Sequence, residues 1–136
     1  MLQKDYEEIA NLIINELGYP NQQPEDVYKR LDIIRKSDNH QTLVACIDDT
    51  VVGFIGLYRT VTYEDDENIR ILAFAVSEKY QRQGIGDALL KEAFDYAEKN
   101  NIKIMKLGSA FHRTNSHLFY EANGFERSGF SFSKDL

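Results

Sequence analysis

Cysteine and proline are both scarce in this chain, and each scarcity excludes a class of protein. The single cysteine, Cys46, excludes an internal disulfide framework, and the apolar run around it predicts a small buried residue in a strand rather than a reactive thiol. With only two prolines and eight glycines among 136 residues, the composition is not that of a disordered chain. We therefore predict one folded domain over residues 1–136, which is long enough for a single hydrophobic core.

Long apolar runs and an excess of positive charge are missing as well. No segment approaches the ~18 apolar residues of a membrane helix, and the first residues do not resemble a signal peptide. We therefore expect no membrane partner and a cytoplasmic location. The formal net charge of −6 argues against nucleic acid as a partner, because phosphate backbones require a basic surface. The charge thus leaves a nucleic-acid-binding domain as a weakly supported functional hypothesis.

Hydrophobic periodicity predicts two helices at the start of the chain, followed by strands and further helices. Helices are expected at Asp5–Leu17, Pro24–Lys36, Gly86–Asn100 and Asn115–Ala122. Strands are expected at Thr42–Ile47, Val51–Thr62, Ile69–Val76 and Lys103–Gly108, with a terminal hairpin at Phe125–Lys134. Gly53 and Gly56 in the second strand indicate a bulge or the close approach of another backbone. The order of elements predicts an α/β domain with a mixed sheet.

A turn with two glycines joins the third predicted strand to the longest helix. Residues 81–86 read Gln-Arg-Gln-Gly-Ile-Gly, and the helix begins at once. Glycines remove side chains, so that a ligand can reach the backbone amides of the loop and of the first helical turn, which have no helical partners. Together with the helix dipole these amides form an anion site, and Arg82 adds charge. The natural ligand of such a site is a pyrophosphate.

Two glycines before a helix also allow three other interpretations. A Walker loop requires a lysine and a hydroxyl residue after the glycines, and neither is present. A dinucleotide-binding fingerprint requires a third glycine where this chain has Leu89. A turn that binds nothing is compatible with the glycines alone, so the pattern needs support from its context.

That context resembles the GCN5-related N-acetyltransferase (GNAT) family. The family signature, Gln/Arg-x-x-Gly-x-Gly/Ala between the central strand and the next helix, is matched by residues 81–86. Residues 119–125, Phe-Tyr-Glu-Ala-Asn-Gly-Phe, resemble a second family segment at a fitting distance, and the resemblance covers about residues 43–136. It implies the acyl-CoA N-acyltransferase fold, a mixed, mostly antiparallel twisted sheet of about six or seven strands with four helices and splayed central strands.

The resemblance implies acetyl-CoA as cosubstrate, no metal, and direct attack by an amine acceptor. The pantetheine arm would pair with the central strand beside a bulge, and the diphosphate would lie on the loop amides. The implied coenzyme-binding residues are Phe74, Ala75, Val76, Gln81, Arg82, Gln83, Gly84, Ile85, Gly86, Asp87, Ala88 and Asn115. Tyr120 matches the family tyrosine that protonates the departing thiolate, which is plausible because a free tyrosine has a pKa of about 10, above that of a thiol.

Three departures from the family pattern bear on this interpretation. Arg113 stands where many members have an asparagine, so Asn115 either contacts the coenzyme or caps the last helix. The central strand offers no carboxylate as general base, which leaves Glu64, Glu67, His112, a water relay or an acceptor that arrives neutral. The strand with which the family usually opens is short or missing.

The acceptor is expected to be a small amine, a peptide N-terminus or a lysine. The acidic run 64–67 is either a solvated loop or an attraction for cationic acceptors. The missing carboxylate on the strand keeps open a non-catalytic CoA-binding or regulatory module. The three histidines, His40, His112 and His117, are too scattered for a metal site. A homodimer is possible, because dimers are common in the family.

Overall fold

The computed structural model describes residues 1–109, 114–129 and 132–136. These residues form two compact units, 1–106 and 107–136, and each unit is described by itself. None of the helices within the described ranges combines the length and the apolar character that crossing a bilayer requires. The single domain, the homodimer and the cytoplasmic location stay predictions.

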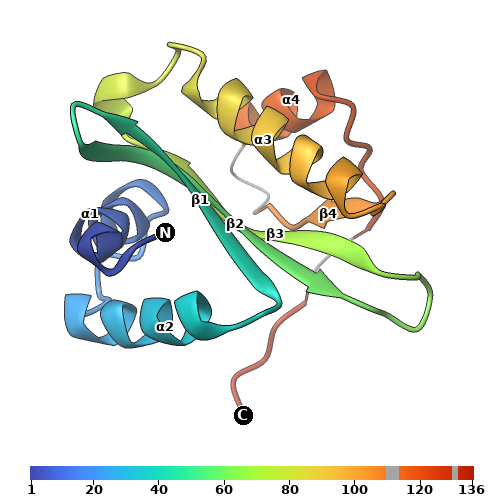
Figure 1. The fold of residues 1–136 in the computed structure, drawn as a ribbon, viewed down its shortest axis with the longest axis horizontal. Coiled ribbons are helices and arrows are strands. Elements are labelled where there is room, and N and C mark those ends of the chain that lie inside the picture. The colour runs from blue at the N-terminus through green and yellow to red at the C-terminus, as the bar shows by residue number, and fades with distance from the viewer. Residues whose placement is uncertain (110–113, 130–131) are drawn as a thin grey trace. The chain divides into compact units, whose positions relative to one another are not determined.

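The sheet has the strand order β1-β2-β3-β4 (Figure 1). It is built from β1 (His40–Ile47), β2 (Thr50–Thr60), β3 (Asn68–Val76) and β4 (Met105–Leu107). β1, β2 and β3 pair antiparallel. Asp48 and Asp49 connect β1 to β2 with φ angles of 51° and 64°, which is the left-handed geometry of a tight hairpin turn. The chain then returns through helix α3 (Ile85–Lys99) to β4, so the sheet is mixed, as predicted.

The predicted number of strands is wrong: the described residues form four strands, not six or seven. Segments 125–129 and 132–136 contain no strand, so the terminal hairpin is not formed by the part of it that the structure describes. Phe132 is 93% exposed, and a strand forms only when a partner edge is available. Before helix α1 (Tyr6–Asn11) the described chain forms a helical turn and no strand.

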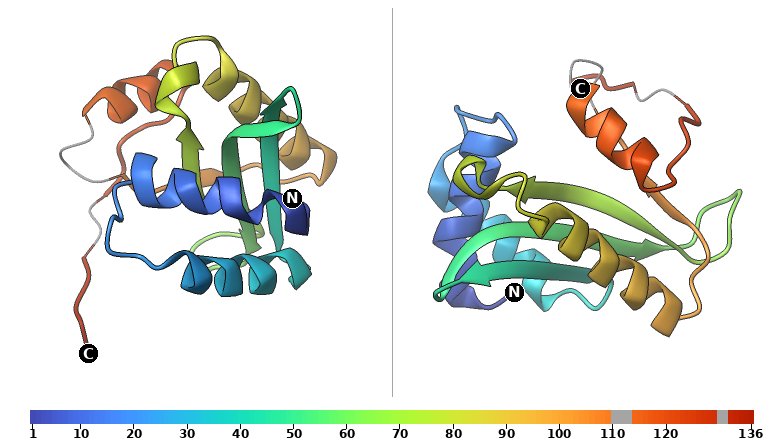
Figure 2. Two further views of the ribbon diagram at one scale, coloured as in Figure 1. Left: turned by 90° about the vertical axis from the view of Figure 1, so that its left-hand side faces the viewer. Right: turned by 90° about the horizontal axis from the view of Figure 1, so that it is seen from above.

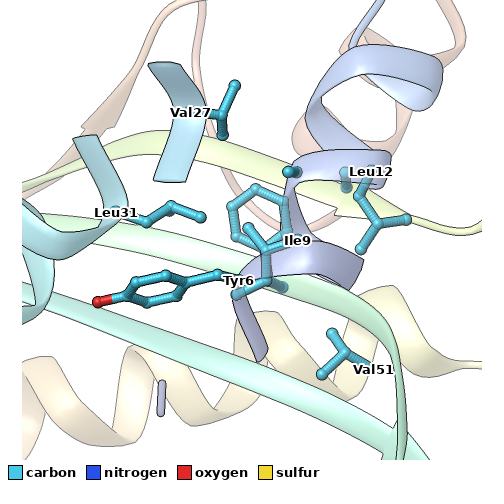
Figure 3. Packing of buried hydrophobic residues seen from close by; sticks show 9 residues of the cluster. Tyr6, Ile9, Leu12, Val27, Leu31 and Val51 are labelled. Carbon is cyan, nitrogen blue, oxygen red and sulfur yellow. The ribbon is translucent and has the colours of Figure 1, made fainter. Parts of the chain in front are cut away.

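Two helical segments pack together on one face of the sheet (Figure 2). The first predicted helix consists of the turn η1 (Gln3–Asp5), α1 (Tyr6–Asn11) and the π-helical turn η2 (Leu12–Glu16), and the second is α2 (Pro24–Lys36). Asp5 does not cap α1: its carboxylate instead accepts a hydrogen bond from the Leu2 amide at 2.7 Å. The buried side chains between helices and sheet include Tyr6, Ile9, Leu12, Val27, Leu31 and Val51 (Figure 3).

Helix α3 covers the opposite face of the same sheet (Figure 1). Of the apolar stripe predicted on this helix, Leu89, Leu90, Ala93 and Ala97 are buried, whereas Phe94 is 38% exposed. Gly53 marks a close approach, as its sequence context suggested. A Cβ there would lie 3.1 Å from the Ala75 carbonyl oxygen and 3.3 Å from Leu89 Cδ1. Gly53 therefore lets α3 and the end of β3 approach β2.

β3 carries a bulge. Gly56 of β2 pairs with Ala73, but the next residue, Leu57, pairs with Ile71, so Leu72 is the extra residue on β3. A bulge shifts the alternation of side chains by one residue. Ala73 and Ala75 therefore face α1 and α2, whereas Ile71 lies on the α3 face, although all three have odd numbers.

Cys46 corrects another expectation, because its side chain is exposed rather than buried. The residue lies near the end of β1, where the last two residues of the strand are exposed. The pKa of its thiol is nevertheless raised, first by partial desolvation and then by the nearby carboxylates of Asp5 and Glu8. A raised pKa lowers the thiolate fraction, so the expectation of an unreactive thiol keeps a physical basis.

Candidate active site

The loop between β3 and α3 is shaped by hydrogen bonds at its start. The Ser77 amide donates to the Val52 carbonyl at 2.7 Å, which ties the end of β3 to β2. The Tyr80 amide donates to the Ser77 carbonyl at 2.8 Å and closes a short helical turn, η3 (Glu78–Tyr80). The side-chain amide of Gln81 then donates to the Val76 carbonyl at 2.9 Å. These bonds direct the chain from the end of the strand straight into α3.

The N-terminus of α3 presents a row of backbone amides without partners. The first helical bond runs from the Ala88 amide to the Gly84 carbonyl at 3.0 Å. No acceptor among the described residues contacts the amides of residues 83–87, and no side chain caps the helix. The loop is exposed, so these donors face solvent. A 15-residue helix adds its positive dipole end, and free amides with a helix dipole are the features on which the predicted anion site depends. Binding of an anion there stays a prediction.

Two residues of this loop have a left-handed backbone. Gly84 has a φ of 82°, and a Cβ at this position would meet no atom within 4 Å. Its backbone conformation, not a lack of space, therefore calls for glycine. Arg82 has a φ of 62°, which is uncommon for a residue with a side chain. This conformation leaves the Arg82 side chain exposed beside the free amides, where it can add positive charge.

The structure brings the predicted coenzyme-binding residues of the first unit together at one end of β3. The stretch 74–76 ends the strand, and residues 81–88 form the loop and the first turn of α3. Two side chains have roles other than ligand contact. The Gln81 side chain holds the loop through Val76, and the Ala75 side chain is 6% exposed and lies in the core. Their contribution to a ligand site is thus made by the backbone.

A carboxylate that sequence reasoning missed supports the same loop. Glu16 lies in η2, where the Leu17 amide reaches back five residues to the Leu12 carbonyl at 3.1 Å. Its Oε1 accepts a hydrogen bond from the Glu78 amide at 3.0 Å, across 62 residues of sequence. π-helical turns are rare and are frequent at functional sites. No local sequence pattern predicts a π-helical turn, so this contact could not be predicted from the sequence.

The acidic run 64–67 is largely paired with cations. Glu67 accepts a hydrogen bond from Arg59 at 2.8 Å, and this bond is the first cause of the raised pKa of Arg59. Asp65 binds Lys106 at 2.6 Å, and Glu64 lies 3.7 Å from Arg70. The run also precedes β3, at the end of the strand opposite to the loop. Asp65 and Glu67 are therefore neutralised by close cations, whereas Glu64 is exposed and has no hydrogen-bonded cation. Because the run lies at the far end of β3, Glu64 and Glu67 are weak candidates for a general base.

In the second unit, helix α4 (Thr114–Ala122) carries Tyr120. The second family segment, residues 119–125, forms the end of this helix and the turn after it. The Phe125 amide donates to the Tyr120 carbonyl at 3.0 Å, and the Gly124 amide donates to the Glu121 carbonyl at 3.1 Å. Gly124 has a φ of 89°. This is a Schellman C-cap, and the Phe125 ring packs edge-on against the Tyr120 ring at 5.9 Å. The motif therefore fixes the end of the helix and the tyrosine with it.

The remaining candidates belong to the same unit. Asn115 lies inside the first turn of α4 and is exposed, so it does not cap the helix as one alternative proposed. His112 and Arg113 lie outside the described residues. Among the described residues, no three acidic, histidine or cysteine side chains gather as a metal site would require.

Comparisons with known proteins bear on this geometry. The model of the Acetyltransferase (GNAT) family matches residues 6–125. N-acetylaspartate synthetase of Homo sapiens is 28% identical over 88 residues, 65% of this chain and 28% of that protein. The chain thus spans under a third of the length of this relative.

Two solved structures share the fold. A GNAT family acetyltransferase of Staphylococcus aureus is 26% identical, with a TM-score of 0.81 and coverage of 100% of this chain and 95% of that one. Aminoglycoside N-acetyltransferase AAC(6')-Iy in complex with CoA is 15% identical, with a TM-score of 0.87 and coverage of 100% and 91%. At that identity the likeness shows the fold alone. Because the family model covers well over half of the sequence, the chain belongs to the Acetyltransferase (GNAT) family, whose members are acyltransferases.

Proposed function

We propose that this protein is an acetyl-CoA-dependent N-acetyltransferase that transfers acetyl to a primary amine of a small molecule, a peptide N-terminus or a lysine. The observation that carries the proposal is the row of unpartnered amides at residues 83–87, at the start of α3 and after a bulged strand. Two negative charges on a diphosphate match these donors and the helix dipole. The CoA complex of a protein with the same fold supports this choice of ligand.

In the proposed reaction the amine nitrogen bonds to the acetyl carbon while the carbon–sulfur bond breaks. The coenzyme supplies the thioester. The backbone of 74–76 orients the pantetheine arm, and an amide near Val76 donates to the carbonyl oxygen as negative charge develops on it. Tyr120 donates its proton to the sulfur and recovers one from solvent. The proton of the amine leaves through water, because β3 carries no carboxylate and the acids that precede it lie at the opposite end of the strand.

The diphosphate claim is tested by a ligand series. Calorimetry with CoA and with pantetheine compares two molecules that share the thiol arm and differ in the nucleotide diphosphate. We expect pantetheine to bind at least about 100-fold more weakly, since it lacks the charged hydrogen-bond acceptors that the amides would bind. Arg82→Gln is expected to weaken CoA binding a few-fold, and Arg30→Gln on α2 is the control. Equal affinities for the two ligands would rule out the diphosphate site.

Turnover distinguishes this enzyme from a CoA-binding module without catalysis. Release of CoA over a panel of amines is followed with a thiol reagent, with a blank for the exposed Cys46. Tight CoA binding without acetylation of any amine favours the module. The observation that keeps this alternative open is that β3 carries no carboxylate. Tyr120→Phe is expected to lower kcat and to leave the affinity for CoA unchanged.

A further inference from the structure

Strand register places Arg70 on the face of the sheet that carries α1 and α2. Phe54 of β2 and Ala75 of β3 are paired, and both belong to the core beneath these helices. Side chains two residues apart on a strand share a face, so Tyr58, four residues after Phe54 on β2, lies on the same face as Phe54. Arg70 pairs with Tyr58 from β3, and His40 pairs with it from β1, with ring centroids 4.7 Å apart. The three side chains form one row.

This row lies on the more open side of the bulge. On the α3 face, Ile55, Leu57 and Ile69 are at most 1% exposed, so the helix closes that side. On the other face Arg70 and Ala73 are only partly buried. Leu72, the extra residue of the bulge between them, is 57% exposed. Within the first unit, solvent therefore reaches the middle of β3 from the side of α1 and α2, next to Arg70.

The charge of Arg70 is poorly satisfied. Glu64 is its one acidic partner among the described residues, and the closest pair of atoms is 3.7 Å apart, too long for a hydrogen bond. Glu64 is 62% exposed and lies 3.8 Å from Lys106, whose close partner is Asp65 at 2.6 Å. The guanidinium thus has no hydrogen-bonded carboxylate. Its planar fork of five donors matches the two oxygens of a carboxylate.

We infer that the acceptor is an amine that also carries a carboxylate, as an amino acid does, and that Arg70 binds this carboxylate. The inference rests on the proposed function and names the substrate class of the same site. Arg70 lies about 10 Å along the strand from Ala73, where the bulge ends and the proposed thioester site begins. A long arginine side chain and a small amino acid together span such a distance. An arginine on this face disfavours cationic acceptors such as polyamines.

Matched acceptors test the inference on the unmodified protein. Glycine, β-alanine, L-aspartate and L-glutamate are compared with glycinamide, β-alaninamide and ethylamine by kcat/KM. We expect the acids to be better acceptors by about 10- to 100-fold, the range of a hydrogen bond between charged groups. The amine of an amide is less basic than that of its acid, so amine basicity works against this result. Equal or better turnover of the amides and of ethylamine overturns the inference.

Variants assign the effect to Arg70. Arg70→Gln should raise KM for the acids about tenfold or more and leave KM for acetyl-CoA unchanged, while Arg70→Lys should retain part of the preference. Arg30→Gln, an exposed arginine of α2 bound to Gln22, is the control. A purely structural role of Arg70 would instead lower kcat for acids and amines alike. A thermal melt verifies that the variants fold.

The two proposals fail in different ways. Absence of CoA binding, or CoA binding without acetylation of any amine, refutes the proposed function. Turnover without a preference for acids refutes only the substrate class. A binding measurement serves even without turnover: L-aspartate is titrated into the CoA-saturated protein and into its Arg70→Gln variant. Carboxylate binding that is lost in the variant supports the inference, and equal or absent binding in both proteins overturns it.

Discussion

Two glycines of one strand provide a matched pair for testing how closely β3 must approach β2. At Gly53 a Cβ would lie 3.1 Å from the Ala75 carbonyl oxygen and 3.3 Å from both Leu89 and Val76. A backbone oxygen cannot rotate away as the end of a side chain can, so β3 or α3 must shift. Overpacking of this kind costs about 1–3 kcal/mol, and the lost chain entropy of glycine returns about 0.5–1 kcal/mol. We expect Gly53→Ala to destabilise the protein by about 1–2 kcal/mol.

Gly56→Ala is the control, three residues along the same strand. The nearest atoms to a Cβ there are 3.8 Å away, an ordinary contact, so only the entropy gain remains and the variant should be neutral or stabilised by up to about 1 kcal/mol. Urea unfolding measures both variants, and a melt should separate them by about 5 °C or more. Because Gly53 contacts the end of β3, Gly53→Ala should also weaken CoA binding. Equal stability of the two variants would refute the reasoning.

Three further predictions follow from backbone geometry and charge. Gly84→Ala should lower the free energy of unfolding by about 1 kcal/mol, because only the left-handed φ is strained. The affinity for CoA should fall at least about tenfold, and unchanged affinity in calorimetry would contradict this. Gly124→Ala breaks the Schellman cap and should speed hydrogen exchange in α4 and lower kcat while CoA binding persists. Cys46 should alkylate with a pH inflection above that of the urea-unfolded protein, since its folded pKa is raised; a lower inflection would contradict this.

Elements with a strong local signal were predicted well. Residues Pro24–Lys36 form the expected helix with its proline in the first turn, and the three long strands lie within a few residues of their predicted bounds. The free amides of loop 81–86 were predicted because the first turn of any helix leaves its amides without helical partners, whatever the rest of the fold does. The ligand of these amides stays a prediction. Helix α3 likewise buries four of the five apolar side chains assigned to it.

Features that depend on distant partners could not be predicted. The terminal segment 125–134 was predicted to be a hairpin, but its residues do not supply the partner edge on which a strand forms. Cys46 lies in an apolar run, yet it is exposed, because burial depends on how neighbouring elements pack and not on the run itself. Glu16 and Glu78 are 62 residues apart and meet through a π-helical turn that has no sequence signature.

The bulge at Leu72 shows why the face of Arg70 was hidden from sequence reasoning. In an unbroken strand Ile69, Ile71, Ala73 and Ala75 would share one face, and all four are apolar, so the strand appears buried throughout. The extra residue reverses the alternation half-way, and one strand then supplies large side chains to the layer under α3 and small ones to the layer under α1. The same reversal places Arg70 on the side of the small residues. The irregularity that would open this strand to a thioester thus also determines which charge the acceptor meets.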